Sequence, residues 1–521
     1  MPVYGRLLRQ CAGRGWLQRL EFYRPLSMVG VILCVVVTHI SLLRVPYFWD
    51  ETYFAPAARD LFLTGKLIPT SVGAESHPPL VYVWVAIWWK LFGFSTPVAR
   101  IAILAVSTFT LVGVYRLGRL LTTGAVPIVS TILTAIYPVF FVETTLIQLD
   151  MAAAGLTLWA LIAHLEGRSW RSGVLFSLAV LAKETAIVAP LVVLAVEVLT
   201  TIWDRKPNTT IRSVRKLGGP LLLPALALVC WFAWLHHATG TLFGNSGYVQ
   251  DNLGGALHPT RMLLAAAQHL WHLLVYMDLF LLTGAAVIIC AICPHASLGR
   301  ASEQSRRAWL LLAAVVAGYV GMLSVVGLVV QARYLLPVYP IVIFASVLAV
   351  SSRTKWWPAL ACLTAIAFVA GLFPYRNRLL FKRDDNLAYV DFAALHQAAA
   401  RSLGDGHKVK VLSTWPVTGE LSAPWLGYAR QPLEILQVES FTQQDLIAAK
   451  QNEPDYILLY PRNACRAEFP FVRAHWWPSH YFRGAKEPTP DEVSNLINAR
   501  VIYYAQSRCD WVAILKIVHT D

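Results

Sequence analysis

Charged and polar side chains that could carry acid–base chemistry and bind an anion lie at the ends of long apolar runs. They are Asp50, Glu51, His77, Glu143, Asp150, Lys183, Glu184, Arg333 and Tyr334. A charge at membrane depth is costly, so such residues are functional candidates by default. In the topology derived below, all of them face one compartment at the bilayer boundary. Carboxylates, a histidine and two cations there suit a hydroxyl that must be deprotonated and a phosphate that must be held.

Each of these residues also has a purely structural interpretation. The two consecutive acids before Thr52 could be solvated loop residues or could cap a helix. Asp150 could cap the apolar helix that follows it, and Lys183 and Glu184 could neutralise one another. Arg333 could extend its charged end to the membrane–water interface. His77 could be held in a turn by Pro78 and Pro79. The functional hypothesis therefore depends on the shared side of the membrane, not on any single residue.

The composition indicates that a bilayer is the main solvent of this chain. Of its 521 residues, 56% are hydrophobic and 14% are charged, and the mean hydropathy is +0.53. A soluble domain carries about 25% charged residues. The net charge of +14 arises mainly in the first 375 residues, which hold 27 Lys and Arg against 14 Asp and Glu. Because these cations sit between apolar runs and not on a soluble face, a membrane protein is favoured over a nucleic-acid-binding protein, and we expect no nucleic-acid partner.

Apolar runs of spanning length predict about eleven transmembrane helices. They lie near residues 25–43, 97–119, 123–142, 149–166, 172–203 (two short spans broken near Lys183), 217–237, 271–294, 309–330, 335–352 and 356–375. The first run follows five arginines and has no small-residue cleavage site behind it. We therefore expect a retained anchor with the N-terminus in the cytoplasm.

The run from Leu80 to Phe94 decides the topology. It has only about fifteen residues, contains Lys90 and is rich in tryptophan, which is typical of an interfacial helix. With this run on the outer surface, the cytoplasmic segments hold 19 of the 27 basic residues of the first 375. If it spanned, most basic residues would move outside, against the positive-inside rule. We therefore expect a first outer loop at about 44–96 that contains interfacial helices.

The chain after the last span has the composition of a soluble domain. From Arg376 to the end, 17 Lys and Arg face 16 Asp and Glu. The pattern predicts a helix, a strand, a second helix and strand, and a closing hairpin, in the segments NLAYVDFAALHQAAARSL, KVKVLS, QQDLIAAKQ, DYILLY, ARVIYYAQ and WVAILKIV. We expect a transmembrane domain over residues 1–375 and a small extracytoplasmic α/β domain over 376–521. A disulfide between Cys465 and Cys509 is permitted in that compartment, and the sequence leaves open whether the two residues pair.

Several segments of the first 375 residues resemble a known superfamily. The run Asp50–Lys66, the tetrapeptide His77-Pro78-Pro79-Leu80, and the pairs Phe92-Gly93 and Ala99-Arg100 resemble the first outer loop of GT-C glycosyltransferases. The likeness is to the ArnT-like and protein O-mannosyltransferase-like branch, which uses dolichyl- or polyprenyl-phosphate sugars. Ala332–Pro337 is similar to the later Arg-Tyr-Leu-Leu-Pro signature of that branch, and Leu181–Glu184 to its Leu-x-Lys segment.

The resemblance implies a polytopic α-helical protein of GT-C type that transfers a sugar from a polyprenyl-phosphate donor to an extracytoplasmic acceptor. It places the general base on Asp50. Glu51 would orient the acceptor or help to set the pKa of Asp50. Lys183 and Arg333, followed by Tyr334, are the candidates for binding the donor phosphate, and Asp150 is a secondary polar contact. His77 stands where aminoarabinose transferases carry a lysine, and a neutral histidine is a weaker ligand for an anion.

The nature of the substrates stays open at this point. A lipid, a protein or a polysaccharide could be the acceptor. No nucleotide-binding fingerprint and no His/Asp cluster with metal-ligand spacing occur in the sequence, so we expect no cofactor and no required metal. The outer segment at about 238–270 is expected to cover the site with Tyr248, Asp251, Asn252, His258 and Arg261.

Two other classes of function compete with the glycosyltransferase. A transporter or flippase of a lipid-linked or small polar substrate would place charges near the midplane in related halves, whereas here they gather at one surface. A non-catalytic envelope assembly protein would depend on the outer domain and not on the first loop.

Overall fold

The computed structural model describes residues 24–73, 77–203, 207–244, 257–293, 303–326, 330–373, 382–404, 409–462, 488–508 and 510–518. Some sequence-based expectations lie outside these ranges: the pairing of Cys465 with Cys509, and the covering roles of Tyr248, Asp251 and Asn252.

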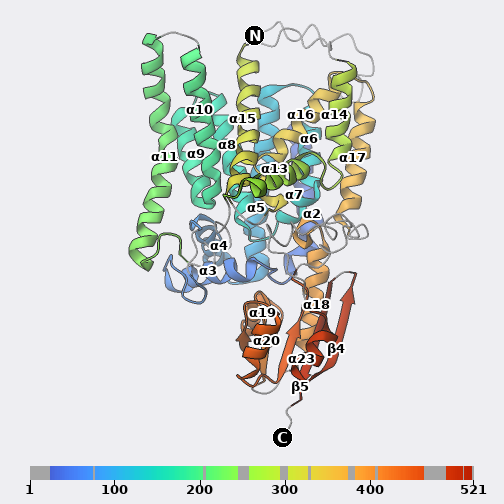
Figure 1. Cartoon of the computed structure of the whole chain (residues 1–521). Helices are drawn as coiled ribbons and strands as arrows, with labels where there is room; N and C mark the ends of the chain where they lie inside the picture. The colour runs from blue at the N-terminus through green and yellow to red at the C-terminus, as the bar shows by residue number, and fades with distance from the viewer. Residues whose placement is uncertain are drawn as a thin grey trace.

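The larger part of the described chain is a bundle of apolar helices (Figure 1). Its helices are α2 (Arg24–His39), α5 (Thr96–Leu121), α6 (Val126–Ile136), α7 (Pro138–Glu143), α8 (Leu149–Leu165), α9 (Ser169–Ala182), α10 (Val188–Trp203), α11 (Pro207–Thr239), α14 (Phe280–Ile292), α15 (Glu303–Val325), α16 (Tyr339–Ser351) and α17 (Trp357–Leu372). Within the described residues, five helical segments are long and apolar enough to cross a membrane. The predicted polytopic helical fold is therefore confirmed in its main features.

Two interruptions of the bundle follow from local chemistry. Pro138 has no N–H to donate and restricts the residue before it, so Tyr137 is extended and separates α6 from α7. Lys183 is also extended, between the end of α9 and the short 3₁₀ helix η3 (Glu184–Ile187). The predicted break near Lys183 is confirmed.

The first outer loop forms two helices at the end of the bundle that faces the C-terminal domain (Figure 1). They are α3 (Glu51–Thr64) and α4 (Leu80–Phe92), and the short 3₁₀ helix η2 (Ile40–Arg44) precedes them. With 13 residues, α4 is too short to cross a bilayer. The loop ends at Ser95, whose side chain accepts a hydrogen bond from Val98 N at the start of α5.

The segment before α14 differs from the sequence-based expectation. A span was predicted near 271–294, after a long covering segment. Instead, Pro259–Leu274 forms helix α13, and Met277 and Asp278 adopt left-handed backbone conformations before α14 begins at Phe280. Figure 1 shows α13 lying across the bundle rather than along it. Its polar residues, Arg261, His269 and His272, are buried inside the protein. Hydropathy treats polar residues as exposed, so it does not identify this helix.

The C-terminal domain is a five-stranded sheet with helices packed on it. Its elements are α18 (Ala388–Ser402), β1 (Lys410–Ser413), α19 (Val417–Ser422), β2 (Glu434–Gln437), α20 (Gln443–Lys450), β3 (Tyr456–Leu459), α23 (Pro490–Ile497), β4 (Ala499–Ser507) and β5 (Asp510–Ile517). The strand order is β2-β1-β3-β5-β4, with parallel β2, β1 and β3 and antiparallel β5 and β4. All predicted elements are present; β2, α19 and α23 are additional.

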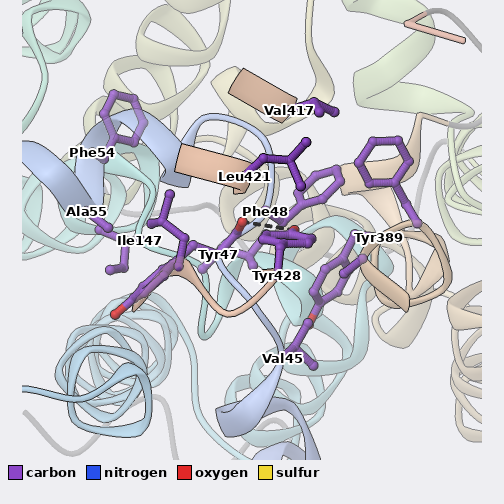
Figure 2. Close-up of a cluster of buried hydrophobic side chains, with 14 of the residues drawn as sticks. Val45, Tyr47, Phe48, Phe54, Ala55, Ile147, Tyr389, Val417, Leu421 and Tyr428 are labelled. Carbon is purple, nitrogen blue, oxygen red and sulfur yellow. Dashed lines mark hydrogen bonds between the residues drawn. The ribbon is translucent and has the colours of Figure 1, made fainter. Parts of the chain in front are cut away.

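One hydrophobic core joins the C-terminal domain to the first outer loop. Figure 2 shows Val45, Tyr47 and Phe48 from the loop packed with Tyr389, Leu421 and Tyr428 of the domain. Phe48 lies with its ring centroid 5.6 Å from that of Tyr389 and 5.5 Å from that of Phe392. The domain is therefore fixed to the loop by packing, not tethered only by the chain after α17.

Packing of α9 against α11 gives a first testable prediction. A Cβ at Gly173 would lie 2.3 Å from the backbone oxygen of Pro220, so a side chain there must push the two helices apart. Gly173→Ala should lower the stability by about 1–3 kcal/mol, seen as a lower thermal unfolding midpoint of the purified protein in detergent. Gly284→Ala in α14 is the matched control, because a Cβ there meets no atom within 4 Å and alanine favours helix. Equal midpoints for the two variants would contradict this account of the packing.

Candidate active site

The turn that precedes α3 directs two neighbouring acids in different directions. Trp49 has a left-handed backbone with φ of 49°, and Asp50 follows it at the N-cap position of α3, where its side chain makes no capping hydrogen bond. The helix-cap interpretation of Asp50 is therefore not realised. Asp50 points to Arg333, whereas Glu51 points into the core beneath the loop.

Glu51 is a fully buried ion-pair partner of Arg100. Both side chains have 0% exposure, and Arg100 donates from Nη1 to Oε1 at 3.1 Å and from Nη2 to Oε2 at 3.0 Å. The backbone N–H of Ile147 donates to Oε1 at 2.7 Å and that of Phe48 to Oε2 at 2.8 Å. Arg100 also donates to the backbone oxygens of Val45, Pro46 and Thr145. With four donors on its two oxygens, Glu51 holds the loop and has no free site for a substrate.

Arg333 gathers carboxylates from three distant parts of the chain. It lies in the 3₁₀ helix η4 (Ala332–Leu335) before α16 and donates to Asp50 Oδ2. Its Nη1 lies 3.5 Å from Asp384 Oδ2 and its Nε lies 3.8 Å from Asp150 Oδ2. The Arg333 side chain is 5% exposed and that of Asp50 is 22% exposed. Among the described residues, no donor contacts Oδ1 of Asp50, so this partly open oxygen can accept a proton from a ligand.

Lys183 extends this cluster through Asp150. Its Nζ lies 2.6 Å from Asp150 Oδ1 and 4.0 Å from the ring centroid of Tyr334. The structure thus brings together five of the predicted site residues: Asp50, Asp150, Lys183, Arg333 and Tyr334. We call these five residues with Asp384 the Arg333 cluster. Lys183 is paired with Asp150 and not, as the alternative interpretation had it, with Glu184.

His77 lies in a second, adjoining group. Its Nδ1 is 2.9 Å from Glu184 Oε2, next to Lys183 in the chain. It also lines a narrow, partly open hollow with room for about one water molecule, together with Tyr53, Ala57, Leu67, Ile68, Pro69, Pro79, Tyr82 and Trp231. The hollow is formed by the first loop and α11, and its lining is mainly apolar and aromatic.

Three acids near Arg333 were missed or given no role by the sequence analysis. Asp384 and Asp385 follow the last bundle helix, and the rule that flagged the other charges at the ends of apolar runs could have flagged them too. Glu143 is fully buried, and no described residue donates a hydrogen bond to either of its oxygens. The region is therefore richer in carboxylates than in cations.

Helix α13 carries a separate group of buried basic residues. Arg261, His269 and His272 have exposures of 0%, 1% and 5%, and their spacing places them on one side of a helix. Burial, together with the nearby charges of Lys382 and Arg261, lowers the pKa of His269 to about 4. Among the described residues, the Nδ1 atoms of His269 and His272 have no hydrogen-bond partner. We call these three residues with Lys382 the α13 cluster. It adjoins the Arg333 cluster, because Lys382 and Asp384 are two residues apart.

No three His, Cys, Asp or Glu side chains come together as metal ligands within the described ranges.

Comparisons with known proteins bear on the family and the fold of this chain. Residues 76–239 match the family of dolichyl-phosphate-mannose-protein mannosyltransferases. The fold is similar to ArnT from Cupriavidus metallidurans in the apo state, with a TM-score of 0.51, 15% identity and coverage of 93% of this chain and 98% of that one. The same protein bound to undecaprenyl phosphate gives a TM-score of 0.52 at 16% identity, covering 93% and 97%.

The archaeal oligosaccharyltransferase AglB from Archaeoglobus fulgidus gives a TM-score of 0.48 at 10% identity over 94% of this chain and 74% of that one. A search of curated proteins finds no match. The family match and the ArnT fold confirm the resemblance to GT-C glycosyltransferases of the ArnT-like and protein O-mannosyltransferase-like branch.

The Glu51–Arg100 pair predicts a strong effect on stability. Glu51→Gln leaves the Arg100 charge buried without its partner, so the free energy of unfolding should fall by about 3–5 kcal/mol. Asp50→Asn should have a much smaller effect, because Asp50 is partly exposed and Arg333 keeps Asp150 and Asp384. Thermal unfolding of both variants in detergent checks this, and a similar loss in both would argue against Glu51 as the anchor.

Asp385 predicts a pH-dependent stability. Burial and the neighbouring charge of Asp384 raise its pKa to about 7, and Tyr276 donates to its Oδ2 at 2.5 Å. A carboxyl whose pKa is higher in the folded than in the unfolded state destabilises the fold progressively as the pH rises from about 4 to about 7. In Asp385→Asn this loss should disappear. The unfolding midpoint of the variant relative to wild type should therefore rise between pH 5 and pH 8. A constant difference over this range would show that Asp385 does not titrate there.

Proposed function

We propose that this chain is an integral membrane glycosyltransferase that moves a sugar from a polyprenyl-phosphate donor to an acceptor hydroxyl at the end of the bundle that carries the C-terminal domain. The observation that carries the proposal is the pairing of Asp50 with Arg333, which holds a carboxylate in place while its Oδ1 stays open. An oriented, partly exposed carboxylate beside buried cations is the arrangement that proton abstraction and phosphate departure need together.

In the proposed reaction, Oδ1 of Asp50 takes the proton of the acceptor hydroxyl as its oxygen bonds to the anomeric carbon of the sugar. The bond between that carbon and the phosphate oxygen breaks, and polyprenyl phosphate leaves with the bonding electrons. One carboxylate on the acceptor side and cations on the leaving side favour a single displacement with inversion. Glu51 serves as a positioning residue, because its oxygens are already occupied by four donors.

Two groups of cations are candidates for the leaving phosphate. Lys183 and Arg333 are nearest to Asp50, but both already contact carboxylates, so a phosphate there must share them. In the α13 cluster, Arg261 and Lys382 are further cations, whereas burial and the nearby charge of Lys382 lower the pKa of His269 and of His272, so both imidazoles are neutral. We infer that Arg333 and Lys183 chiefly order the carboxylates, and that Arg261 and Lys382 of the α13 cluster supply the remaining positive charge to the phosphate.

We propose that the hollow beside His77 is the entrance of a site that widens to take the apolar part of a substrate. Its lining by Tyr53, Tyr82 and Trp231 is the mainly aromatic and apolar surface that holds organic ligands. His77 is engaged with Glu184 at 2.9 Å, so we propose that it shapes this hollow and orients Glu184 rather than binding phosphate on its own.

We further propose that the site faces the extracytoplasmic side. The support is the distribution of basic residues, which the positive-inside rule assigns to the loops at the other end of the bundle. The C-terminal domain and the first outer loop share one core, so both lie on the same side as Asp50.

The test is release of free polyprenyl phosphate from a panel of polyprenyl-phosphate sugars, with a cell-envelope extract as acceptor. Asp50→Asn should lower kcat by about 10²–10⁴-fold, because the amide cannot accept the proton. The matched control is Asp391→Asn, an acid on α18 that is 40% exposed and pairs with Arg508 away from the cluster; it should retain full activity.

In sealed vesicles, release should require acceptor on the side of the C-terminal domain. Full activity of a folded Asp50→Asn protein would falsify the assignment of the base. Movement of donor across the vesicle membrane without release of its phosphate would favour a flippase.

A further inference from the structure

The residue directly before Asp50 has an unusual backbone. Trp49 has a φ of 49°, in the left-handed region that a bulky side chain rarely enters. Such a conformation persists only when the surrounding structure holds it, and it clusters at functional sites. The direction in which Asp50 leaves the turn depends on this conformation, so whatever holds Trp49 also sets the position of Asp50.

The side chain of Trp49 is held by the C-terminal part of the chain. Its ring centroid lies 5.4 Å from that of Trp415 and 5.9 Å from that of Phe392. The guanidinium of Arg383 lies 5.4 Å from the ring of Trp49 and 4.4 Å from that of Phe392. Arg383 is in turn fixed in the domain, since its Nε donates to Asp510 Oδ1 at 2.7 Å.

The backbone two residues earlier is held on both of its polar groups. The N–H of Tyr47 donates to Leu426 O at 3.1 Å, and its carbonyl accepts a hydrogen bond from Tyr428 Oη at 3.0 Å. Tyr47 is 1% exposed and Tyr428 is 4% exposed, and Figure 2 shows the two side by side in the core. Gly427, which lies between Leu426 and Tyr428 in the chain, has a φ of 98°, and a Cβ at this residue would lie 3.3 Å from Pro46.

Residues 415–428, which make these contacts, are also held by the rest of the C-terminal domain and by α3. Glu420 of α19 lies 2.7 Å from His396 of α18, and both are nearly fully buried. The neighbouring Gly419 faces Thr52 of α3, with 3.6 Å between its ideal Cβ position and the threonine Cβ. Residues 415–428 are therefore fixed to the domain on one side and to the first loop on the other.

We propose that the C-terminal domain is a positioning element of the active site: residues 415–428 hold the turn at 46–49 so that Asp50 meets Arg333. The proposal rests on the glycosyltransferase function given above, and it assigns the domain an effect on the rate of transfer rather than on recruitment of the acceptor. Tyr47, Phe392 and Tyr428 are buried between the two parts of the protein and Trp49 and Trp415 are half-buried, so most of this surface is not available to bind an acceptor.

The dipeptide Arg383-Asp384 reinforces this coupling. Arg383 contacts Asp510 and Trp49, while Asp384 reaches in the other direction to Arg333 at 3.5 Å. Any shift of the domain relative to the loop therefore disturbs Asp50 through its preceding turn and Arg333 through one of its carboxylates.

Tyr428→Phe tests the proposal with the removal of one hydroxyl. The variant leaves the buried carbonyl of Tyr47 without its donor, so the turn should loosen while the domain stays folded. We expect kcat to fall by roughly ten- to a hundredfold, the effect of a small misplacement of a catalytic group, with an unchanged KM for donor and acceptor. Tyr504→Phe is the matched control, because Tyr504 lies on β4 and its hydroxyl contacts Gln506, remote from the loop.

Hydrogen–deuterium exchange of the full-length proteins supplies a second measurement that does not require activity. The amides of residues 45–53 should exchange faster in Tyr428→Phe than in wild type and in Tyr504→Phe. A higher KM with an unchanged kcat would overturn the proposal in favour of acceptor binding by the domain, and so would unchanged exchange at residues 45–53. If the wild type itself released no carrier from any donor, the proposed function would fail, whereas the exchange data would still decide whether residues 415–428 hold the turn.

Discussion

The buried pair of Glu51 and Arg100 is the interaction on which the site depends. An ion pair with no solvent contact is tolerated only when its remaining donors and acceptors are satisfied, and here four hydrogen bonds reach the carboxylate. These bonds tie the first loop to α5 and to the segment before α8. Because Asp50 is the preceding residue, fixing Glu51 in the core leaves Asp50 at the surface of that core, where it meets Arg333.

Arg333 connects Asp50, whose position the Glu51–Arg100 pair sets, to carboxylates from distant segments of the chain. Its three carboxylate partners come from the first loop, from α8 and from the segment that enters the C-terminal domain. A guanidinium suits this role because its donors point in several fixed directions and it keeps its charge when buried. The site is thus shared between both parts of the chain, which explains why the bundle and the C-terminal domain have a common core.

The sequence predicted those parts of the fold that local windows determine. Hydropathy and length gave α4 as a separate short helix, and the break at Lys183 and the order of the main C-terminal elements followed from residue patterns. Helix α13 was missed because its polar residues are buried against neighbours that lie far away in the chain. Strand β2 was missed because it is four residues long and only partly buried, so it has no clear alternation.

For the candidate site, the sequence singled out Asp50, Asp150, Lys183, Arg333 and Tyr334, because the cost of a charge in a bilayer acts on each residue separately. It did not determine who pairs with whom. Lys183 pairs with Asp150 and not with its neighbour Glu184, and Glu51 pairs with Arg100 and does not contact Asp50. Asp384, which the sequence analysis did not single out, contacts Arg333. Asp50 and Arg333 are 283 residues apart, and contacts over such separations depend on distances of a few ångströms that only the packed tertiary structure sets.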